Sequence, residues 1–181
     1  GTEPVPGLIA DRRVRAVTLT GSDLAGSRVA EVAGRELKKA VLELGGSDFF
    51  LVLEDADLDQ AAEVGVRARF QNGGQSCIAA KRFLLQESIA EAFLDRFLAH
   101  CRELTVGPPL DRANRIGPLA RADLRERIAD QVERSRERGA VVLLGGRVES
   151  GPGYFYPPTV LDEVRAPSPV LRDEIFGPVA P

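Results

Sequence analysis

Hydrophobic and polar residues alternate in short blocks along this chain, and the blocks predict strands and helices in turn. The β-branched run 14–20 predicts a strand, Gly21-Ser22-Asp23 predicts a turn with helix-capping side chains, and a helix should follow to about Lys38. The run 40–44 predicts a second strand, which should stop at Gly45-Gly46. A strand, a turn, a helix and a strand make a βαβ unit, whose strands should be parallel with a right-handed crossover.

The same alternation continues to the end of the chain. Strands are expected over 48–53, 82–86 and 140–144, and helices over 58–70, about 88–104 and 120–138. Asp57 should cap the first of these helices, and the sequence Ser88-x-x-Glu91 predicts a capping box at the start of the second. The segment 156–161 is expected to be extended and to lie at a sheet edge. Alternating strands and helices indicate an α/β protein.

Composition narrows the class of protein. The 181 residues include 24 lysines and arginines against 27 acidic residues, a formal net charge of −3, and 44% of them are hydrophobic. These values are typical of a globular protein that buries a core without disulfides. The near balance of charge argues against a nucleic-acid partner, because such domains usually carry a basic excess. The apolar runs are too short to span a membrane, so we expect a cytoplasmic protein without a membrane partner.

The two cysteines stand in different contexts. Cys77 follows the polar, glycine-rich loop Asn72-Gly73-Gly74-Gln75-Ser76 and precedes Lys81-Arg82. Main-chain amides and a nearby cation favour the thiolate, which is the nucleophilic form of cysteine. Cys101 lies in a predicted helix and is expected to be a buried hydrophobic residue. Together with the single histidine, His100, these cysteines form no common metal-binding pattern, so no metal site is expected.

Two glycine-containing turns follow the first two predicted strands. Thr20-Gly21-Ser22 joins a strand to a helix, where main-chain N–H groups and the helix dipole can face a phosphate, although many βα turns contain these residues without binding one. Glu43 lies near the end of the second predicted strand, in the segment Glu43-Leu44-Gly45-Gly46. The carboxyl edge of a parallel sheet is where α/β proteins bind ligands, and a partly desolvated glutamate there can act as a base near neutral pH.

Read together, these segments resemble those of the NAD(P)-dependent aldehyde dehydrogenases, from about Val14 to the last residue. The matching segments are Thr20-Gly21-Ser22, Leu42-Glu43-Leu44-Gly45-Gly46, Gln71-Asn72-Gly73-Gly74-Gln75-Ser76-Cys77 and Glu174-Ile175-Phe176-Gly177-Pro178-Val179. Their joint occurrence in this order is very specific. Within the family, the chain is most similar to bacterial succinate-semialdehyde dehydrogenases.

The resemblance implies the catalytic residues. Cys77 is the implied nucleophile that adds to the aldehyde carbon, and Glu43 is the implied base that activates water to hydrolyse the resulting thioester. Their side chains are therefore expected to open onto one cleft. Gln71 stands where many succinate-semialdehyde dehydrogenases place an arginine that can grip the distal carboxylate, and Ala79 stands where some place a second cysteine as a redox switch.

The resemblance also implies the cofactor, NAD or NADP, and the residues that hold it. Gly21 and Ser22 would lie against the pyrophosphate and Leu44 against the nicotinamide. Glu174 would hold the nicotinamide ribose, with Phe176 packed beside it.

The family's chains are much longer than this one. Residues 1–45 are similar to the C-terminal part of a Rossmann-like cofactor domain, and residues 46–181 are similar to most of the α/β thiol-bearing catalytic domain of the aldehyde dehydrogenase fold. The earlier cofactor-domain strands and an oxyanion-hole asparagine are expected upstream, and the strand used for homo-oligomerisation is expected downstream.

The expected reaction is the oxidation of an aldehyde, succinate semialdehyde, to the carboxylic acid. One alternative is a catalytically inactive fragment of such an enzyme, because loss of one oxyanion donor alone costs ~10²–10³ in rate. A second alternative is a cysteine-dependent hydrolase in which His100 is the base for Cys77. Replacing His100 should separate the two enzyme classes, because the reactivity of Cys77 should not depend on it in a dehydrogenase.

Overall fold

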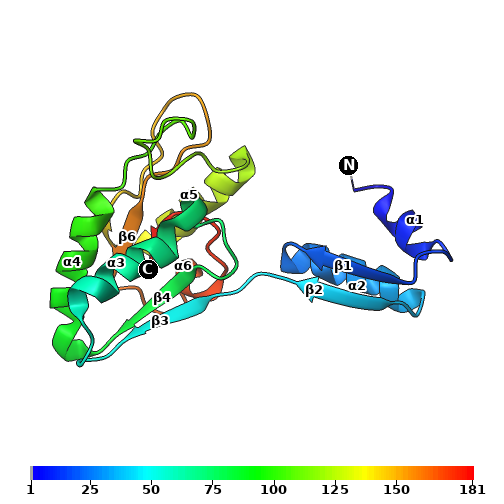
Figure 1. Cartoon of the computed structure of the whole chain (residues 1–181), viewed down its shortest axis with the longest axis horizontal. Helices are drawn as coiled ribbons and strands as arrows, with labels where there is room; N and C mark the ends of the chain where they lie inside the picture. Colours follow the sequence, from blue (N-terminus) through cyan, green and yellow to red (C-terminus); the bar gives the residue numbers. More distant parts are fainter. Residues whose placement is uncertain (1) are drawn as a thin grey trace. The chain divides into compact units, whose positions relative to one another are not determined.

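The computed structural model describes residues 2–181, which divide into two compact units, residues 2–46 and residues 47–181 (Figure 1). Strands and helices follow one another in both units, so the α/β class predicted from the sequence is confirmed. Among the described residues, no helix is both long enough and apolar enough to cross a membrane.

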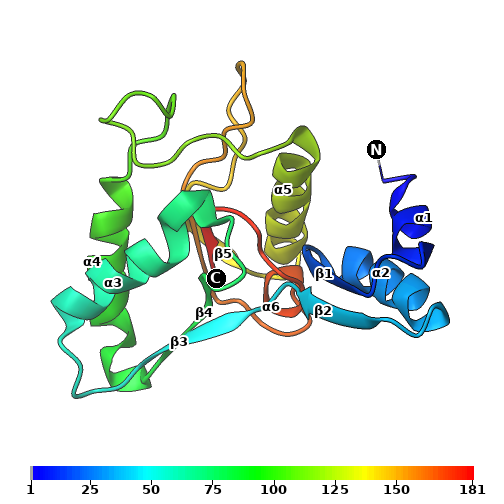
Figure 2. The ribbon, with the colours of Figure 1, turned by 45° about the vertical axis from the view of Figure 1, so that its right-hand side comes forward.

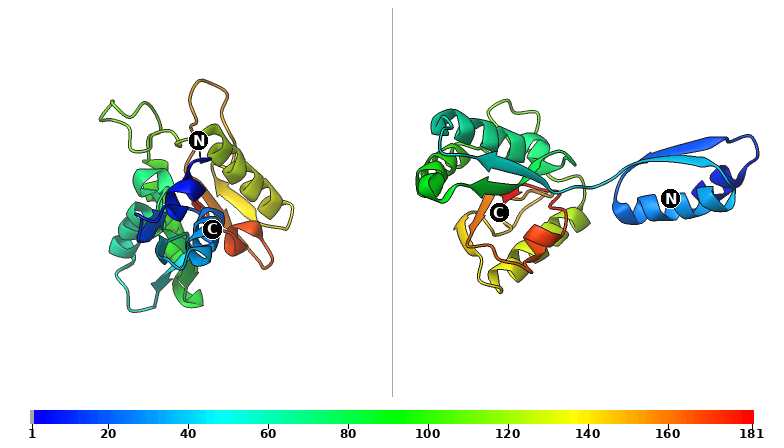
Figure 3. Two further views of the ribbon diagram at one scale, coloured as in Figure 1. Left: turned by 90° about the vertical axis from the view of Figure 1, so that its right-hand side faces the viewer. Right: turned by 90° about the horizontal axis from the view of Figure 1, so that it is seen from below.

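The first unit is a βαβ unit preceded by a short helix. Its elements are helix α1 (Val5–Ala10), strand β1 (Ala16–Thr20), helix α2 (Asp23–Arg35) and strand β2 (Lys39–Glu43). The two strands are parallel, with Ala16 opposite Lys39 and Thr20 opposite Glu43, as the sequence predicted. Helix α2 covers one face of the strand pair (Figure 3). The carboxyl ends of β1 and β2 therefore lie at the same edge.

The second unit begins with another parallel βαβ arrangement. Its first elements are strand β3 (Asp48–Val52), helix α3 (Leu58–Phe70), strand β4 (Ala80–Leu85) and helix α4 (Ala90–Arg102). As predicted, Asp57 caps α3, and its carboxylate accepts hydrogen bonds from the amides of Asp59 and Gln60, both at 3.1 Å. Helices α3 and α4 pack against each other (Figure 1).

The start of α4 differs from the prediction. The N-cap of α4 is Ile89, and no side chain caps the helix. The chain enters α4 through a 3-10 turn, Glu87–Ile89, in which the amide of Ile89 donates to the carbonyl of Gln86 at 3.0 Å. Ser88 thus lies inside this turn and is not the N-cap of the helix, and the predicted capping box is wrong.

A three-stranded sheet completes the second unit. This part of the unit consists of helix α5 (Ala122–Arg136), strand β5 (Val141–Leu144), strand β6 (Thr159–Asp162), helix α6 (Pro169–Arg172) and strand β7 (Val179–Ala180). The order is β5-β6-β7, with β6 antiparallel to β5 and parallel to β7. The segment 156–161 was expected at an edge, but β6 is the middle strand. Strand β6 can pair on both sides because Pro157 and Pro158 precede it, so they remove no N–H donor from the strand itself.

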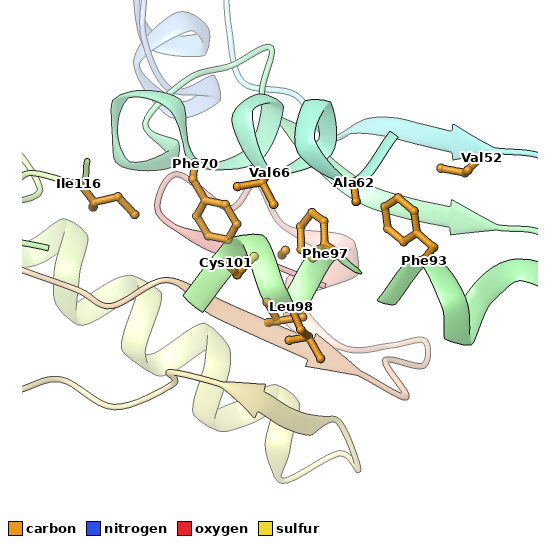
Figure 4. Packing of buried hydrophobic residues seen from close by; sticks show 11 residues of the cluster. Val52, Ala62, Val66, Phe70, Phe93, Phe97, Leu98, Cys101 and Ile116 are labelled. Atoms are coloured by element: carbon orange, nitrogen blue, oxygen red, sulfur yellow. The ribbon is translucent and has the colours of Figure 1, made fainter. Parts of the chain in front are cut away.

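Helices cover both faces of the second unit. Figures 2 and 3 show α3 and α4 on one side of the strands and α5 with α6 on the other. Val160 and Ala180 belong to the hydrophobic cluster under α3 and α4, whereas Leu161 and Val179 belong to the cluster under α5, because successive side chains of a strand point to opposite faces. In Figure 4 the side chains of α3 point toward those of α4. This packing supports the loop between α3 and β4, which carries Cys77.

Candidate active site

The carboxyl edge of the first unit brings its two glycine-containing turns together. Gly21 follows β1, and its amide donates to the carbonyl of Glu43, at the end of β2, over 3.0 Å. Ser22 is the N-cap of α2, and its hydroxyl accepts a hydrogen bond from the amide of Ala25 at 3.3 Å. Gly21, Ser22 and Glu43 therefore lie at one edge of the parallel pair, which is the usual ligand-binding edge in α/β proteins.

Leu44 packs on α2 over a glycine of the helix. A Cβ added at Gly26 would lie 2.5 Å from Cδ2 of Leu44, so the leucine occupies the space that a side chain on the helix would need. Glu43 is exposed, and Leu44 is half-buried. The first unit thus offers a helix N-terminus, whose main-chain N–H groups and dipole suit a pyrophosphate, beside an apolar surface and a carboxylate.

In the second unit, Cys77 lies exposed in the loop between α3 and β4. The loop begins with three residues of left-handed backbone, Asn72 (φ 55°), Gly73 (φ 63°) and Gly74 (φ 72°), a conformation that glycine and asparagine adopt most readily. The side-chain amide of Asn72 donates to the carbonyl of Gln75, and that of Gln75 donates to the carbonyl of Asn72, both at 3.1 Å. The thiol is therefore presented by a braced, polar loop.

Cys101 and His100 have different surroundings. Cys101 is 1% exposed within the core, as predicted, and burial raises the pKa of its thiol to about 12. At neutral pH this thiol stays protonated. His100 lines an open groove together with Gln71 and Asn72, and Cys77 is not one of the residues that line it.

Arg69, near the end of α3, is a buried cation that holds the Cys77 loop and was not predicted from the sequence. Its Nη2 donates to the carbonyls of Gly74 at 2.8 Å and Gly177 at 2.7 Å. Its Nη1 donates to the carbonyl of Ala80 at 3.0 Å. Burial lowers the pKa of Arg69 to about 10, although the charge of Glu174 opposes this shift. The guanidinium remains charged at neutral pH and joins the loop to a distant segment of the chain.

The Cys77 loop and that distant segment are also in main-chain contact. A Cβ at Gly74 would lie 2.2 Å from the carbonyl oxygen of Gly177, so the two backbones approach as closely as glycine allows. The distant segment is also bound to α5, because the side-chain amide of Gln131 in that helix donates to the carbonyl of Glu174 at 3.1 Å. Glu174 and Phe176 are both half-buried in this segment, which is therefore held close to the loop.

Lys81 is a second buried cation, and it connects Cys77 itself to Glu174. Its ammonium donates to the carbonyl of Cys77 at 2.6 Å and lies 3.9 Å from a carboxylate oxygen of Glu174. The Lys81 side chain has no exposed surface, whereas 23% of the Glu174 side chain is exposed. Burial, and then the charge of Arg69, lower the pKa of Lys81, while Glu174 is the largest influence in the other direction.

Lys81-Arg82 was expected to place cations close behind the thiol, and the structure gives the two residues different partners. Arg82 donates through Nε and Nη2 to the carbonyl of Ser47, at 3.0 and 2.6 Å. Lys81 and Arg69 both bind main-chain carbonyls. The sequence holds no signal for the role of Arg69, because its partners are main-chain carbonyls.

Comparisons with known proteins agree with this architecture. Residues 1–181 match the aldehyde dehydrogenase family. The chain is 51% identical over 176 residues to the NAD(P)+ succinate semialdehyde dehydrogenase of Escherichia coli, which covers 97% of this chain and 38% of that protein. It is 53% identical over 173 residues to a probable NADP(+) succinate-semialdehyde dehydrogenase of Synechocystis sp., which covers 96% of this chain and 38% of that protein.

Solved structures give the same result. The chain superposes on lactaldehyde dehydrogenase from Escherichia coli with a TM-score of 0.94 and 38% identity, over 98% of this chain and 37% of that one. It superposes on 3,6-anhydro-L-galactose dehydrogenase in complex with NAP with a TM-score of 0.95 and 33% identity, over 100% of this chain and 39% of that one. The chain thus spans about 38% of the length of the curated relatives that it matches.

Proposed function

The chain belongs to the aldehyde dehydrogenase family, and we propose that it is part of an enzyme that oxidises succinate semialdehyde to the carboxylic acid with NAD(P)+. The observation that carries the proposal is the exposed thiol of Cys77 on a loop tied by buried cations to the segment of Glu174. The succinate-semialdehyde dehydrogenases among the relatives support the choice of substrate. Residues 1–45 are assigned to the cofactor domain and residues 46–181 to the catalytic domain.

The chemistry begins at Cys77. Its thiolate adds to the aldehyde carbon and forms a thiohemiacetal, which places the C–H bond to be broken at a fixed position. When bound, NAD(P)+ supplies the acceptor for the hydride that leaves this carbon. The carbon then remains attached to the sulfur as a thioester. Glu43 takes a proton from water as the water attacks the thioester, so that the carboxylic acid leaves and the thiolate is restored.

The cofactor assignments follow the geometry of each unit taken separately. The capped N-terminus of α2 at Gly21 and Ser22 suits the pyrophosphate, and the apolar side chain of Leu44 at the same edge suits the nicotinamide. The partly exposed carboxylate of Glu174 can accept hydrogen bonds from ribose hydroxyls, with Phe176 beside it. The proposal includes a cytoplasmic homo-oligomer without nucleic-acid or membrane partners, and the near balance of charge argues against a nucleic-acid partner.

A chimera provides the test, because the chain is shorter than its relatives. This chain would replace the matching 176 residues of the Escherichia coli succinate semialdehyde dehydrogenase. Cys77→Ala should abolish the reduction of NADP+ by succinate semialdehyde, whereas Cys101→Ala, which changes a buried thiol, should retain it. A Cys77→Ala chimera that keeps its activity would refute the assignment of the nucleophile.

Glu43 is tested in the same chimera. Glu43→Gln should leave one rapid turnover of hydride transfer and slow the later turnovers by ~10²–10⁴, the usual contribution of a general base. Equal rates before and after the first turnover would contradict its role in hydrolysis of the thioester. The 181-residue chain by itself should reduce NAD(P)+ far more slowly than the ~1 per second typical of enzymes, because it spans only part of its relatives.

A further inference from the structure

We propose that Lys81 is a positioning residue for this reaction, whose buried ammonium fixes the main chain of the nucleophile Cys77 relative to the carboxylate of Glu174. The inference rests on the proposed function, because it assumes that Cys77 reacts and that Glu174 holds the cofactor. Lys81 would touch neither substrate nor cofactor and would act through these two residues.

The N–H groups of the Lys81 ammonium explain how this residue connects Cys77 to Glu174. A lysine ammonium has three N–H donors. In Lys81 they reach the carbonyl of Cys77 at 2.6 Å and the carbonyl of Ala79 at 3.4 Å, and the nitrogen lies 3.9 Å from Glu174 Oε1. The two carbonyls belong to the turn that presents the thiol, and the carboxylate belongs to a segment almost a hundred residues away in the sequence. One cation thus joins the two groups.

Lys81 is enclosed by other titratable groups. Its side chain is fully buried, and Arg69, Glu174, Asp48 and Cys77 face it. Removal of the ammonium is expected to cost stability, because the carbonyls of Cys77 and Ala79 would lose their charged donor. Relief of the buried charge, and of the repulsion from Arg69, offsets part of this cost in Lys81→Met. We therefore expect a folded variant of somewhat lower stability.

The rate of the reaction should fall when the ammonium of Lys81 is removed. The carbonyl of Cys77 is only a few bonds from its sulfur, so release of this carbonyl lets the sulfur move relative to Glu174 and the cofactor. A misplacement of ~1 Å can cost ~10²-fold in rate. The expected signature is a fall in turnover together with a higher KM for NADP+ in a variant that still folds, which a merely structural lysine would not produce.

The experiment compares Lys81→Met with Lys38→Met in the chimera described above. Lys38 is a matched control, because its ammonium also donates to two main-chain carbonyls, those of Ile9 and Asp11. Lys81→Met should lower kcat by ~10- to 100-fold and raise the KM for NADP+, with a thermal midpoint that falls by no more than a few degrees. Lys38→Met should leave kcat and this KM within about twofold of the parent chimera.

Hydrogen exchange supplies a readout that needs no cofactor. In Lys81→Met, amide exchange should become ~10-fold faster in residues 75–79 and in residues 173–177 together, because one charged donor holds both segments. Lys38→Met should change neither segment. The effects of Lys81→Met and Glu174→Gln on the KM for NADP+ should also fail to add in the double variant, because both remove the same link.

Any of the following results would overturn the inference. A Lys81→Met chimera with kcat within twofold of the parent, or with faster exchange in only one segment, would show that Lys81 does not couple Cys77 to Glu174. A Lys81→Met chimera that fails to fold would show that the lysine serves stability. These failures differ from failure of the proposed function, in which Cys77→Ala would retain activity.

Discussion

The edge of the first unit and the Cys77 loop of the second are held in different ways. At the edge, one parallel strand pair and the cap of α2 bring Gly21, Ser22 and Glu43 together, and these contacts need no cation. The loop is held by buried Arg69 and Lys81, and the bond from Arg69 to the carbonyl of Gly177 joins residues 108 positions apart. The first arrangement depends on local structure and the second on tertiary packing, so substitutions should affect them unequally.

The largest effect is expected where the loop meets the distant segment. Gly74→Ala places a Cβ 2.2 Å from the carbonyl oxygen of Gly177 and puts alanine at a φ of +72°, so the free energy of unfolding of the second unit should fall by about 4 kcal/mol. Gly139→Ala is the matched control, because Gly139 has a φ of +97° but no atom within 4 Å of the added Cβ. It should cost only about 1 kcal/mol. Urea denaturation measures both, and equal losses would contradict the close contact.

Removal of the guanidinium should have the next largest effect. Arg69→Met leaves the carbonyls of Gly74, Ala80 and Gly177 without their donor, and it should lower the free energy of unfolding by about 3 kcal/mol despite the relief of a buried charge. Arg67→Met, at an exposed position on the same helix, should stay within about 0.5 kcal/mol of the parent. Urea denaturation of the two variants tests the difference. A stable Arg69→Met variant would mean that the loop does not depend on its buried cation.

The smallest effect is expected at the edge of the first unit. Gly26→Ala adds a Cβ 2.5 Å from a methyl carbon of Leu44, but the end of a leucine side chain can move, and alanine favours the helix. A net loss of about 1 kcal/mol should result. Gly34→Ala, in the same helix with no atom within 4 Å of the added Cβ, should instead gain about 0.5 kcal/mol. The measurement is thermal unfolding, and effects of the same sign would show that Leu44 does not pack on Gly26.

The same difference explains which features the sequence could predict. The bounds of α3 and its Asp57 cap, and the parallel pairing of β1 with β2, arise from local patterns, and the structure has them as predicted. The Ser88 capping box was wrong because a 3-10 turn leads into α4, and 156–161 was wrongly placed at an edge because strand pairing on both sides decides that position. Arg69 was missed, and the partners of Lys81 were not predicted, because main-chain carbonyls leave no pattern in a sequence.

The catalytic pairing stays a prediction. Cys77 and Glu43 come from matching family segments, and they belong to different units. The exposure of Cys77 and the bracing of its loop support the role of the nucleophile. The position of Glu43 at the carboxyl edge of β2 supports that of the base.

Direct detection of the acylated thiol tests this account best. The Glu43→Gln chimera would be mixed with succinate semialdehyde and NADP+, quenched with acid, digested and analysed by mass spectrometry. The account predicts a succinyl thioester on the peptide that contains Cys77, formed only when NADP+ is present. A succinyl group on Cys101, or hydride transfer without any acylated Cys77, would contradict it.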